Sequence, residues 1–144
     1  MPPPLPRDPA ALNARAQDYL PGRLGIEFLQ AEPEAVSGRL PVSKAVMAPN
    51  GYLHAASVIA LVDTLAGFGT MLNLPDGAQA FTTIELKSNF TGTVRAGGAV
   101  LGRATPAHLG RTTQVWDAVA SDEATGKTVA LFRCTQMILW PKEG

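Results

Sequence analysis

The sequence predicts an α+β fold in which a curved antiparallel β-sheet wraps around one long central α-helix. The apolar stretch 55–72 has the length and composition of a core helix. Segments on both sides of it alternate apolar and polar residues, as half-buried strands do. The connections between the later segments are too short for crossover helices, which favours antiparallel pairing.

The length of 144 residues suits one domain, and we expect an N-terminal extension with a short helix over 1–20 and the main domain over 21–144. A content of 46% hydrophobic and 17% charged residues indicates a folded chain. Twelve basic and twelve acidic residues balance, so no nucleic-acid or membrane-surface partner is expected. The single cysteine excludes an internal disulfide, and the absence of an N-terminal secretory pattern favours a cytoplasmic location.

The first residues contain five prolines, at positions 2, 3, 4, 6 and 9, and are expected to be extended. Asp8 is expected to cap a short helix that has Pro9 in its first turn. This helix is predicted to run to about Leu20, where Pro21-Gly22 ends it.

Alternation predicts two strands before the long helix and four after it. Gly97-Gly98, Leu109-Gly110 and Thr125-Gly126 separate the last four, which we therefore expect to form a meander. The predicted strands lie near residues 24–28, 36–43, 84–90, 98–106, 111–121 and 127–139.

The helix predicted over 55–72 is apolar on nearly every face, so burial on all sides is expected. Its length also suits a membrane span, but Asp63 near its centre would be costly in hydrocarbon, and we expect no span. Its glycines and alanines suit close approach to a sheet.

The stretch Asn50-Gly51-Tyr52-Leu53-His54-Ala55-Ala56 joins a turn to the start of this helix. Free N–H groups at a helix N-terminus bind negative charge, so the amides near Ala55 could stabilise an oxyanion in acyl transfer. Asp63, about 12 Å further along the helix axis, could supply the second half of such a site.

Structural interpretations of the same residues stay open. A buried carboxylate at Asp63 could be satisfied by neighbouring donors at a subunit contact. His54 could cap the helix, and Asn50-Gly51 is an ordinary turn signal. Cys134 lies inside an alternating strand and is expected to be inert, and no metal-ligand spacing links His54, His108 and Asp63.

Taken together, these residues resemble the hotdog-fold acyl-CoA thioesterases of the phenylacetate-degradation and 4-hydroxybenzoyl-CoA thioesterase branch, over about residues 20–140. Residues 51–56 and Leu61-Val62-Asp63 are similar to that branch's Gly-x-x-His-Gly-Gly and Leu-Ala-Asp. The sequence departs from the branch at Ala55-Ala56, where glycines are usual, and at Ala48, where asparagine is usual.

The resemblance implies hydrolysis of an acyl or aryl thioester to a carboxylate and free coenzyme A, with coenzyme A as part of the substrate and no metal or other cofactor. It implies that the Ala55 N–H binds the oxyanion, with His54 beside it, and that Asp63 is the nucleophile or general base. It also implies that Thr83 helps to place water and that Arg111 contacts coenzyme A. Asn50 and Gly51 are further candidates for substrate contacts.

Two other functions remain open from the sequence: a hotdog hydratase or dehydratase with His54 as base, and an acyl-CoA-binding protein without turnover. The two last strands place apolar residues on both faces, so the outer face also needs cover. With the resemblance, this predicts a homo-oligomer, either a dimer or a dimer of dimers (homotetramer), with Thr83 facing the Asp63 of a partner.

Overall fold

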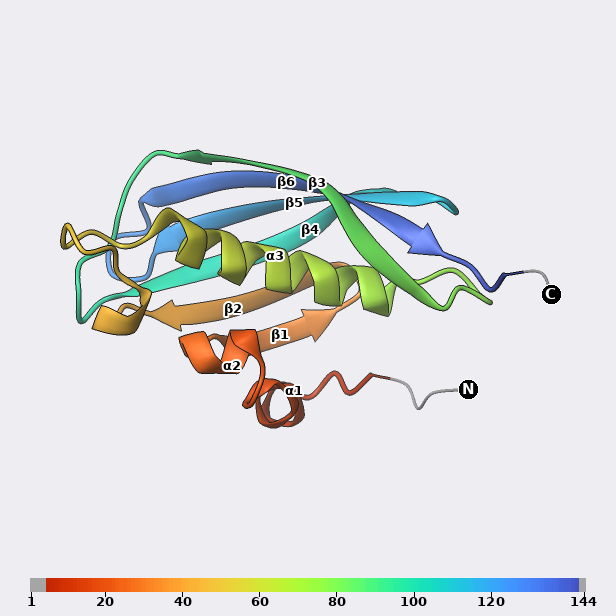
Figure 1. The fold of residues 1–144 in the computed structure, drawn as a ribbon, viewed down its shortest axis with the longest axis horizontal. Helices are drawn as coiled ribbons and strands as arrows, with labels where there is room; N and C mark the ends of the chain where they lie inside the picture. The colour runs from red at the N-terminus through yellow and green to blue at the C-terminus, as the bar shows by residue number, and fades with distance from the viewer. Residues whose placement is uncertain (1–4, 143–144) are drawn as a thin grey trace.

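The computed structural model describes residues 5–142 and confirms an α+β fold built on one antiparallel sheet (Figure 1). The six strands lie in the order β1-β2-β4-β5-β6-β3. One long helix lies along one face of the sheet. The elements are α1 (Pro9–Ala16), α2 (Leu20–Leu24), β1 (Glu27–Glu32), β2 (Ala35–Pro41), a 3-10 turn η1 (Lys44–Val46), α3 (Ala55–Leu72), β3 (Ala80–Phe90), β4 (Ala99–Leu109), β5 (Thr113–Asp122) and β6 (Thr128–Leu139).

Helix α3 begins and ends where the sequence predicts, at Ala55 and Leu72. By length and mean hydropathy it could cross a membrane, but here it forms the centre of the core. Its burial follows one stripe, which includes Leu61 and Leu65, whereas Asp63 and Phe68 are half-buried and Ala55 is exposed. The expected burial on all sides is therefore wrong for the single chain, because the sheet covers one side of the helix and the side that carries Asp63 and Phe68 is left partly exposed.

Small residues allow the helix to approach the sheet closely, as the sequence predicts. A Cβ atom at Gly69 would overlap the indole ring of Trp116, which is fully buried on β5. On the sheet, Gly38 and Gly102 are partners in the β2–β4 register, and a Cβ on either would press on Leu65 of α3. These three contacts fix the distance between the helix and the sheet.

The predicted four-strand meander is wrong at its first strand. β4, β5 and β6 do form a meander, but β3 pairs with β6 at the far edge of the sheet and makes no ladder with β4. Residues 91–98 therefore cross the end of the sheet instead of closing a hairpin. Alternation along β3 identifies a strand but carries no information on its partner.

The N-terminal helix is shorter than predicted. Asp8 caps α1 by accepting from the Ala11 N–H, but α1 ends at Ala16. Pro21 and Gly22 do not end it. Pro21 stands in the first turn of α2, where its missing N–H costs nothing. Residues 1–4, which hold three of the prolines in the predicted extended start, lie outside the described residues.

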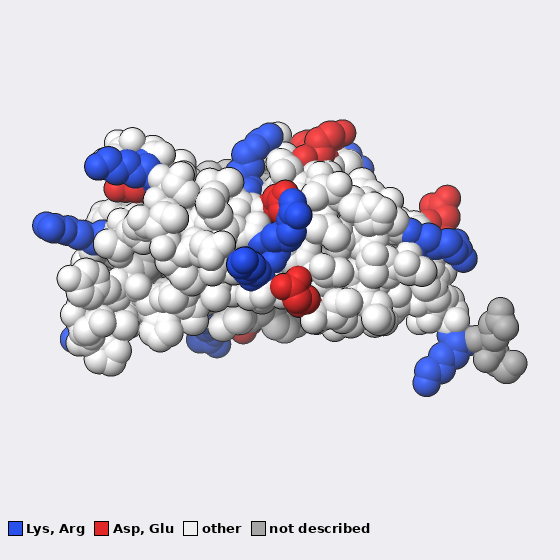
Figure 2. All heavy atoms as spheres, turned by 90° about the horizontal axis from the view of Figure 1, so that it is seen from above, with Lys and Arg blue, Asp and Glu red and all other residues white. Residues whose placement is uncertain are grey.

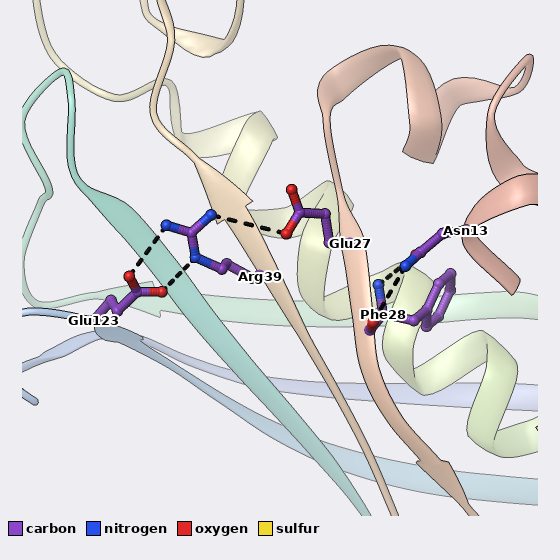
Figure 3. A network of polar contacts seen from close by, with 5 residues as sticks. All are labelled: Asn13, Glu27, Phe28, Arg39 and Glu123. Carbon is purple, nitrogen blue, oxygen red and sulfur yellow. Dashed lines mark hydrogen bonds and ion pairs between the residues drawn. The ribbon is translucent and has the colours of Figure 1, made fainter. Parts of the chain in front are cut away.

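Helix α1 packs on β1 and belongs to the core. Leu12 is fully buried, and the Asn13 side chain accepts from the backbone N–H of Phe28 (Figure 3). Strand β1 begins at Glu27, three residues later than predicted, because Leu24 is taken up by α2. Arg39 of β2 forms ion pairs with Glu27 and Glu123, so one guanidinium ties β1 to the β5–β6 turn (Figure 3).

The outer face of the sheet exposes apolar side chains, as the two last strands predict. Val119, Leu131 and Met137 are each more than 40% exposed, whereas Trp116 and Phe132 on the inner face are buried. Charged side chains of both signs are scattered over the side of the molecule drawn in Figure 2, with wide uncharged areas between them. In the single chain, this apolar surface has no cover.

Candidate active site

The first turn of α3 leaves one backbone amide free. His54 is the N-cap residue: its Nδ1 accepts from the Ala56 N–H at 3.0 Å, and its carbonyl accepts from the Ser57 N–H. Within residues 5–142, no acceptor is bonded to the N–H of Ala55, which is exposed. The amide that the sequence assigns to the oxyanion is therefore the one that the cap leaves available.

The cap also sets the role of the imidazole. Because Nδ1 of His54 accepts a hydrogen bond, the ring proton of the neutral form lies on Nε2, which is then a donor. The side chain borders a hollow of about 330 Å³ between α2, η1 and the start of α3. The capping role considered from the sequence is confirmed, and it leaves Nε2–H free to donate to a carbonyl oxygen.

Asp63 lies in the middle of α3 and lines a second cavity of about 330 Å³. Its Oδ1 atom is buried and has no hydrogen-bond partner in the structure. Burial raises the pKa of this carboxyl group above its usual value, since the charged form is poorly solvated there. No described donor of the same chain satisfies this oxygen, which fits either a reactive group or a carboxylate satisfied by donors at a subunit contact.

Thr83 of β3 lines the same cavity as Asp63 of the same chain. The antiparallel β3–β6 pairing carries β3 past the C-terminal half of α3, where Phe81 lies against Gly67. Thr83 therefore lies beside Asp63 of its own chain, and the predicted approach of Thr83 to the Asp63 of a partner subunit stays a prediction. The remaining lining is mostly apolar: Pro21, Thr64, Gly67, Phe68, Met71 and Phe81.

A buried polar cluster behind this cavity was not singled out from the sequence. The Thr83 hydroxyl donates to Oε1 of Gln136 at 2.7 Å, and Nε2 of Gln136 points to Sγ of Cys134 at 3.5 Å. Gln136 is fully buried. The available signal was a glutamine at an inward position of a strand, between Cys134 and Ile138, where alternation calls for an apolar residue.

Cys134 is the inert cysteine that the sequence predicts. Burial, with a further contribution from the charge of Asp63, raises the pKa of its thiol to about 12. The thiolate needed for nucleophilic attack is therefore absent at neutral pH.

Asn50 and Gly51 form the tight turn before α3. The Asn50 side chain accepts from the Tyr52 N–H, and Gly51 has a φ of 88°, which few other residues adopt. Gly51 and Tyr52 also border a hollow of about 440 Å³, and Arg95 is part of the same lining. The turn interpretation is confirmed, and substrate contact by this turn stays a prediction.

Arg111 lies outside both cavities, in the turn between β4 and β5. Its guanidinium stacks on the ring of Trp140 at 3.9 Å, and the Trp140 indole donates to the Arg111 carbonyl oxygen at 3.1 Å. The side chain is exposed but held flat against the ring, which leaves N–H groups at its edge for an anion.

The two halves of the predicted site do not meet within one chain. Ala55 and Asp63 are eight residues apart on one straight helix, which is about 12 Å of axial rise. His54 and Asp63 line separate cavities with no lining residue in common. A thioester carbonyl must lie about 3 Å from both the oxyanion donor and the attacking group.

A long helix lying along one face of a six-stranded antiparallel sheet defines a hotdog fold. Comparison with known proteins supports this class. The thioesterase superfamily profile matches residues 50–129, more than half of the chain. The chain therefore belongs to the thioesterase superfamily.

Comparison with individual relatives supports the same superfamily. The chain is 33% identical to the proofreading thioesterase EntH of Klebsiella pneumoniae over 114 residues, covering 79% of this chain and 82% of EntH. It is 31% identical to the 1,4-dihydroxy-2-naphthoyl-CoA hydrolase of Listeria monocytogenes over 112 residues, covering 78% and 89% of the two chains. A crystal structure of a mutant of thioesterase PA1618 from Pseudomonas aeruginosa superposes with a TM-score of 0.85 at 30% identity, covering 92% and 94%. The protein is a thioester hydrolase.

Proposed function

We propose that this thioester hydrolase acts on acyl-CoA or aryl-CoA, releasing a carboxylate and free coenzyme A. The observation that carries the proposal is the pairing of two unsatisfied groups on one helix: the free N–H of Ala55 and the partnerless Oδ1 of Asp63. The printed name of the Listeria relative supports a coenzyme A ester as the substrate class. The acyl group itself is left open.

The chemistry follows from these groups. The Ala55 N–H, the helix N-terminus and Nε2–H of His54 stabilise the negative charge that develops on the carbonyl oxygen. Asp63 attacks the carbonyl carbon or removes a proton from an attacking water, and burial raises its pKa above the usual value, which makes the carboxylate a stronger base. Coenzyme A enters only as part of the substrate, and the scheme uses no metal or redox cofactor.

We infer that a complete site takes its oxyanion donor from one chain and its carboxylate from another. The axial separation of about 12 Å between Ala55 and Asp63 is too large for both groups of one helix to act on one carbonyl. Two copies of α3 packed side by side in opposite directions would bring the N-terminus of one helix to the middle of the other. A homodimer, or a dimer of dimers, in the cytoplasm is therefore part of the proposal.

The two alternative functions, a hydratase and a binding protein without turnover, require different properties of His54 and Asp63. A hydratase with His54 as general base needs an unprotonated nitrogen facing the substrate, but the cap uses Nδ1 and leaves Nε2 as a donor. A binding protein without turnover does not need a half-buried carboxylate at Asp63, whose Oδ1 atom has no donor within its own chain. Hydrolysis therefore accounts for both residues.

Release of free thiol from acetyl-CoA, decanoyl-CoA and benzoyl-CoA tests the proposal. Hydrolysis of at least one ester by the wild-type protein is expected. Binding of all three without thiol release would identify the non-catalytic alternative, and hydration of an enoyl-CoA without thiol release would identify the hydratase.

A variant at Ala55 tests the oxyanion donor directly. Ala55→Pro deletes this N–H at the first helical position, where proline is well tolerated, and the φ of −70° and ψ of 132° at His54 suit a residue before proline. We expect kcat to fall by about a hundredfold or more, the scale for loss of one oxyanion donor. Ala55→Gly keeps the N–H and is the matched control. Equal activity of the two folded variants would refute the assignment.

A further inference from the structure

We propose that Gln136 is a positioning residue for hydrolysis: it accepts the Thr83 hydroxyl proton, so that Thr83 presents only acceptor lone pairs to the cavity lined by Asp63. The inference rests on the proposed function and deepens it, because it favours attack by water over direct attack by the carboxylate. It concerns a residue that lies behind the cavity and does not itself line it.

The hydrogen-bond inventory of Thr83 carries the argument. A threonine hydroxyl has one proton and two lone pairs. The proton is engaged at 2.7 Å by Oε1 of Gln136. The side-chain amide of Gln136 is held in this orientation because its Nε2 atom donates to Sγ of Cys134, which lies two residues earlier on the same face of β6. Thr83 is left with acceptor capacity alone.

The local strand geometry holds this arrangement in place. Thr83 and Gln136 are direct partners in the β3–β6 register, and the pairing shifts immediately afterwards, so that Ile84 is the extra residue of a β-bulge. Bulges redirect side chains and are common beside active sites. Gln136 is fully buried and its amide has a partner at each end, which limits rotation of its side chain.

Two acceptors facing one cavity select a ligand with two donors. The ionised carboxylate of Asp63 and the hydroxyl oxygen of Thr83 both accept, and a water molecule that donates one proton to each keeps its lone pairs for the carbonyl carbon. In the step, the water oxygen bonds to that carbon while one water proton passes to Asp63. The tetrahedral oxyanion then collapses, the C–S bond breaks, and the leaving thiolate takes the proton back from Asp63.

Variants of Thr83 test the proposal without disturbing Gln136 by substitution. Thr83→Val removes the hydroxyl, and kcat is expected to fall about tenfold or more with little change in KM, within the range for one group that orients a proton transfer. Thr83→Ser keeps the same donor and acceptor and is expected to stay within about threefold of the wild type. Full activity of folded Thr83→Val would overturn the proposal.

Gln136→Met tests the positioning residue itself. It removes the acceptor while nearly keeping the volume, and we expect a loss in kcat similar to that of Thr83→Val. The double variant should lose no more kcat than Thr83→Val alone, because each substitution removes the same hydrogen bond between Thr83 and Gln136. Additive losses would show that Gln136 acts independently of Thr83 and would contradict the proposal.

Gln114→Met is the matched control, because Gln114 is the β5 partner of Gln136 and equally buried but bonds the Trp116 indole and the Asn73 carbonyl instead. We expect it to lower the unfolding temperature and leave kcat within about twofold. An equal loss of kcat in Gln114→Met would reduce Gln136 to a general packing role. All rates are measured on whichever of acetyl-, decanoyl- and benzoyl-CoA the wild type hydrolyses fastest, so failure of the proposed function itself shows first as an inactive wild type.

Discussion

The proposed chemistry depends on Asp63, and the environment of this residue favours that role. Burial of its Oδ1 atom, which has no donor of its own chain as a partner, disfavours the charged form and raises the pKa of the carboxyl group, which makes the carboxylate a stronger base. The structure thus gives Asp63 a property that a solvated surface aspartate lacks.

The first residue-scale prediction is that Asp63→Asn loses at least about a hundredfold in kcat, the scale associated with general base catalysis. The substitution keeps the size and shape of the side chain but removes the basic oxygen. Thiol release by the purified variant measures the effect, with circular dichroism to show that the fold is kept. Turnover close to that of the wild type would rule out a catalytic carboxylate.

The same substitution has an expected signature in stability. The folded-state pKa of Asp63 lies above its ordinary value of 3.8, so the folded state holds this proton more tightly than the unfolded state. Stability is therefore lost as the pH rises from 3.8 through the folded-state pKa. At pH 7, Asp63→Asn should unfold at a higher urea concentration than the wild type, and the difference should shrink as the pH falls toward 3.8. A pH-independent difference would contradict the sign of this shift.

Arg111 offers a prediction on binding. Its guanidinium is held on Trp140, outside the cavities of His54 and Asp63, so Arg111→Ala should raise KM for coenzyme A esters severalfold and leave kcat nearly unchanged. The control substrate is the same acyl group on N-acetylcysteamine, which has no phosphate. Equal effects on both substrates would show that Arg111 does not bind the nucleotide part.

At the scale of elements, the packing of α3 on β5 is the tightest constraint. Gly69→Ala would push a methyl group into the rigid, fully buried indole of Trp116, and a cost of about 1–3 kcal/mol is expected. Gly67→Ala on the same helix is the matched control, because its Cβ would meet only the edge of Phe81 at 3.3 Å. Urea unfolding should separate the two variants, and equal free energies of unfolding would refute this packing argument.

Elements with a strong local signal were predicted well. Helix α3 has the bounds expected from its apolar run, and β6 differs from its expected bounds by one residue at its start. The partner of β3 was missed because strand pairing depends on contacts distant in sequence. The break between α1 and α2 was missed because Pro21 can start a helix as well as end one.

The candidate site, like the fold, was predictable where its signal is local in the sequence. His54, Ala55 and Asp63 stand out because helix start, spacing and the one charge on an apolar helix are local features. Gln136 did not stand out, since its role depends on which strand lies opposite it. The pairing of Thr83 with the cavity of its own Asp63 likewise follows from the β3–β6 register and not from β3 itself.

At the scale of the whole molecule, the single chain is incomplete in two respects. Its outer sheet face exposes Val119, Leu131 and Met137, and β3 is an edge strand whose side chains are largely exposed. Its oxyanion donor and its carboxylate are too far apart to share a substrate. The proposed site requires association of two copies through α3, and the outer sheet face, on the opposite side of the sheet, is left for a second contact such as that of a dimer of dimers.

The most direct test mixes two inactive proteins, Ala55→Pro and Asp63→Asn, under conditions of subunit exchange verified by native mass spectrometry. If each site combines Ala55 of one chain with Asp63 of another, mixed dimers contain one intact site, and an equal mixture should recover activity corresponding to about a quarter of the wild-type sites. If both groups act within one chain, no intact site can form. Absence of recovered thiol release despite proven exchange would contradict the account.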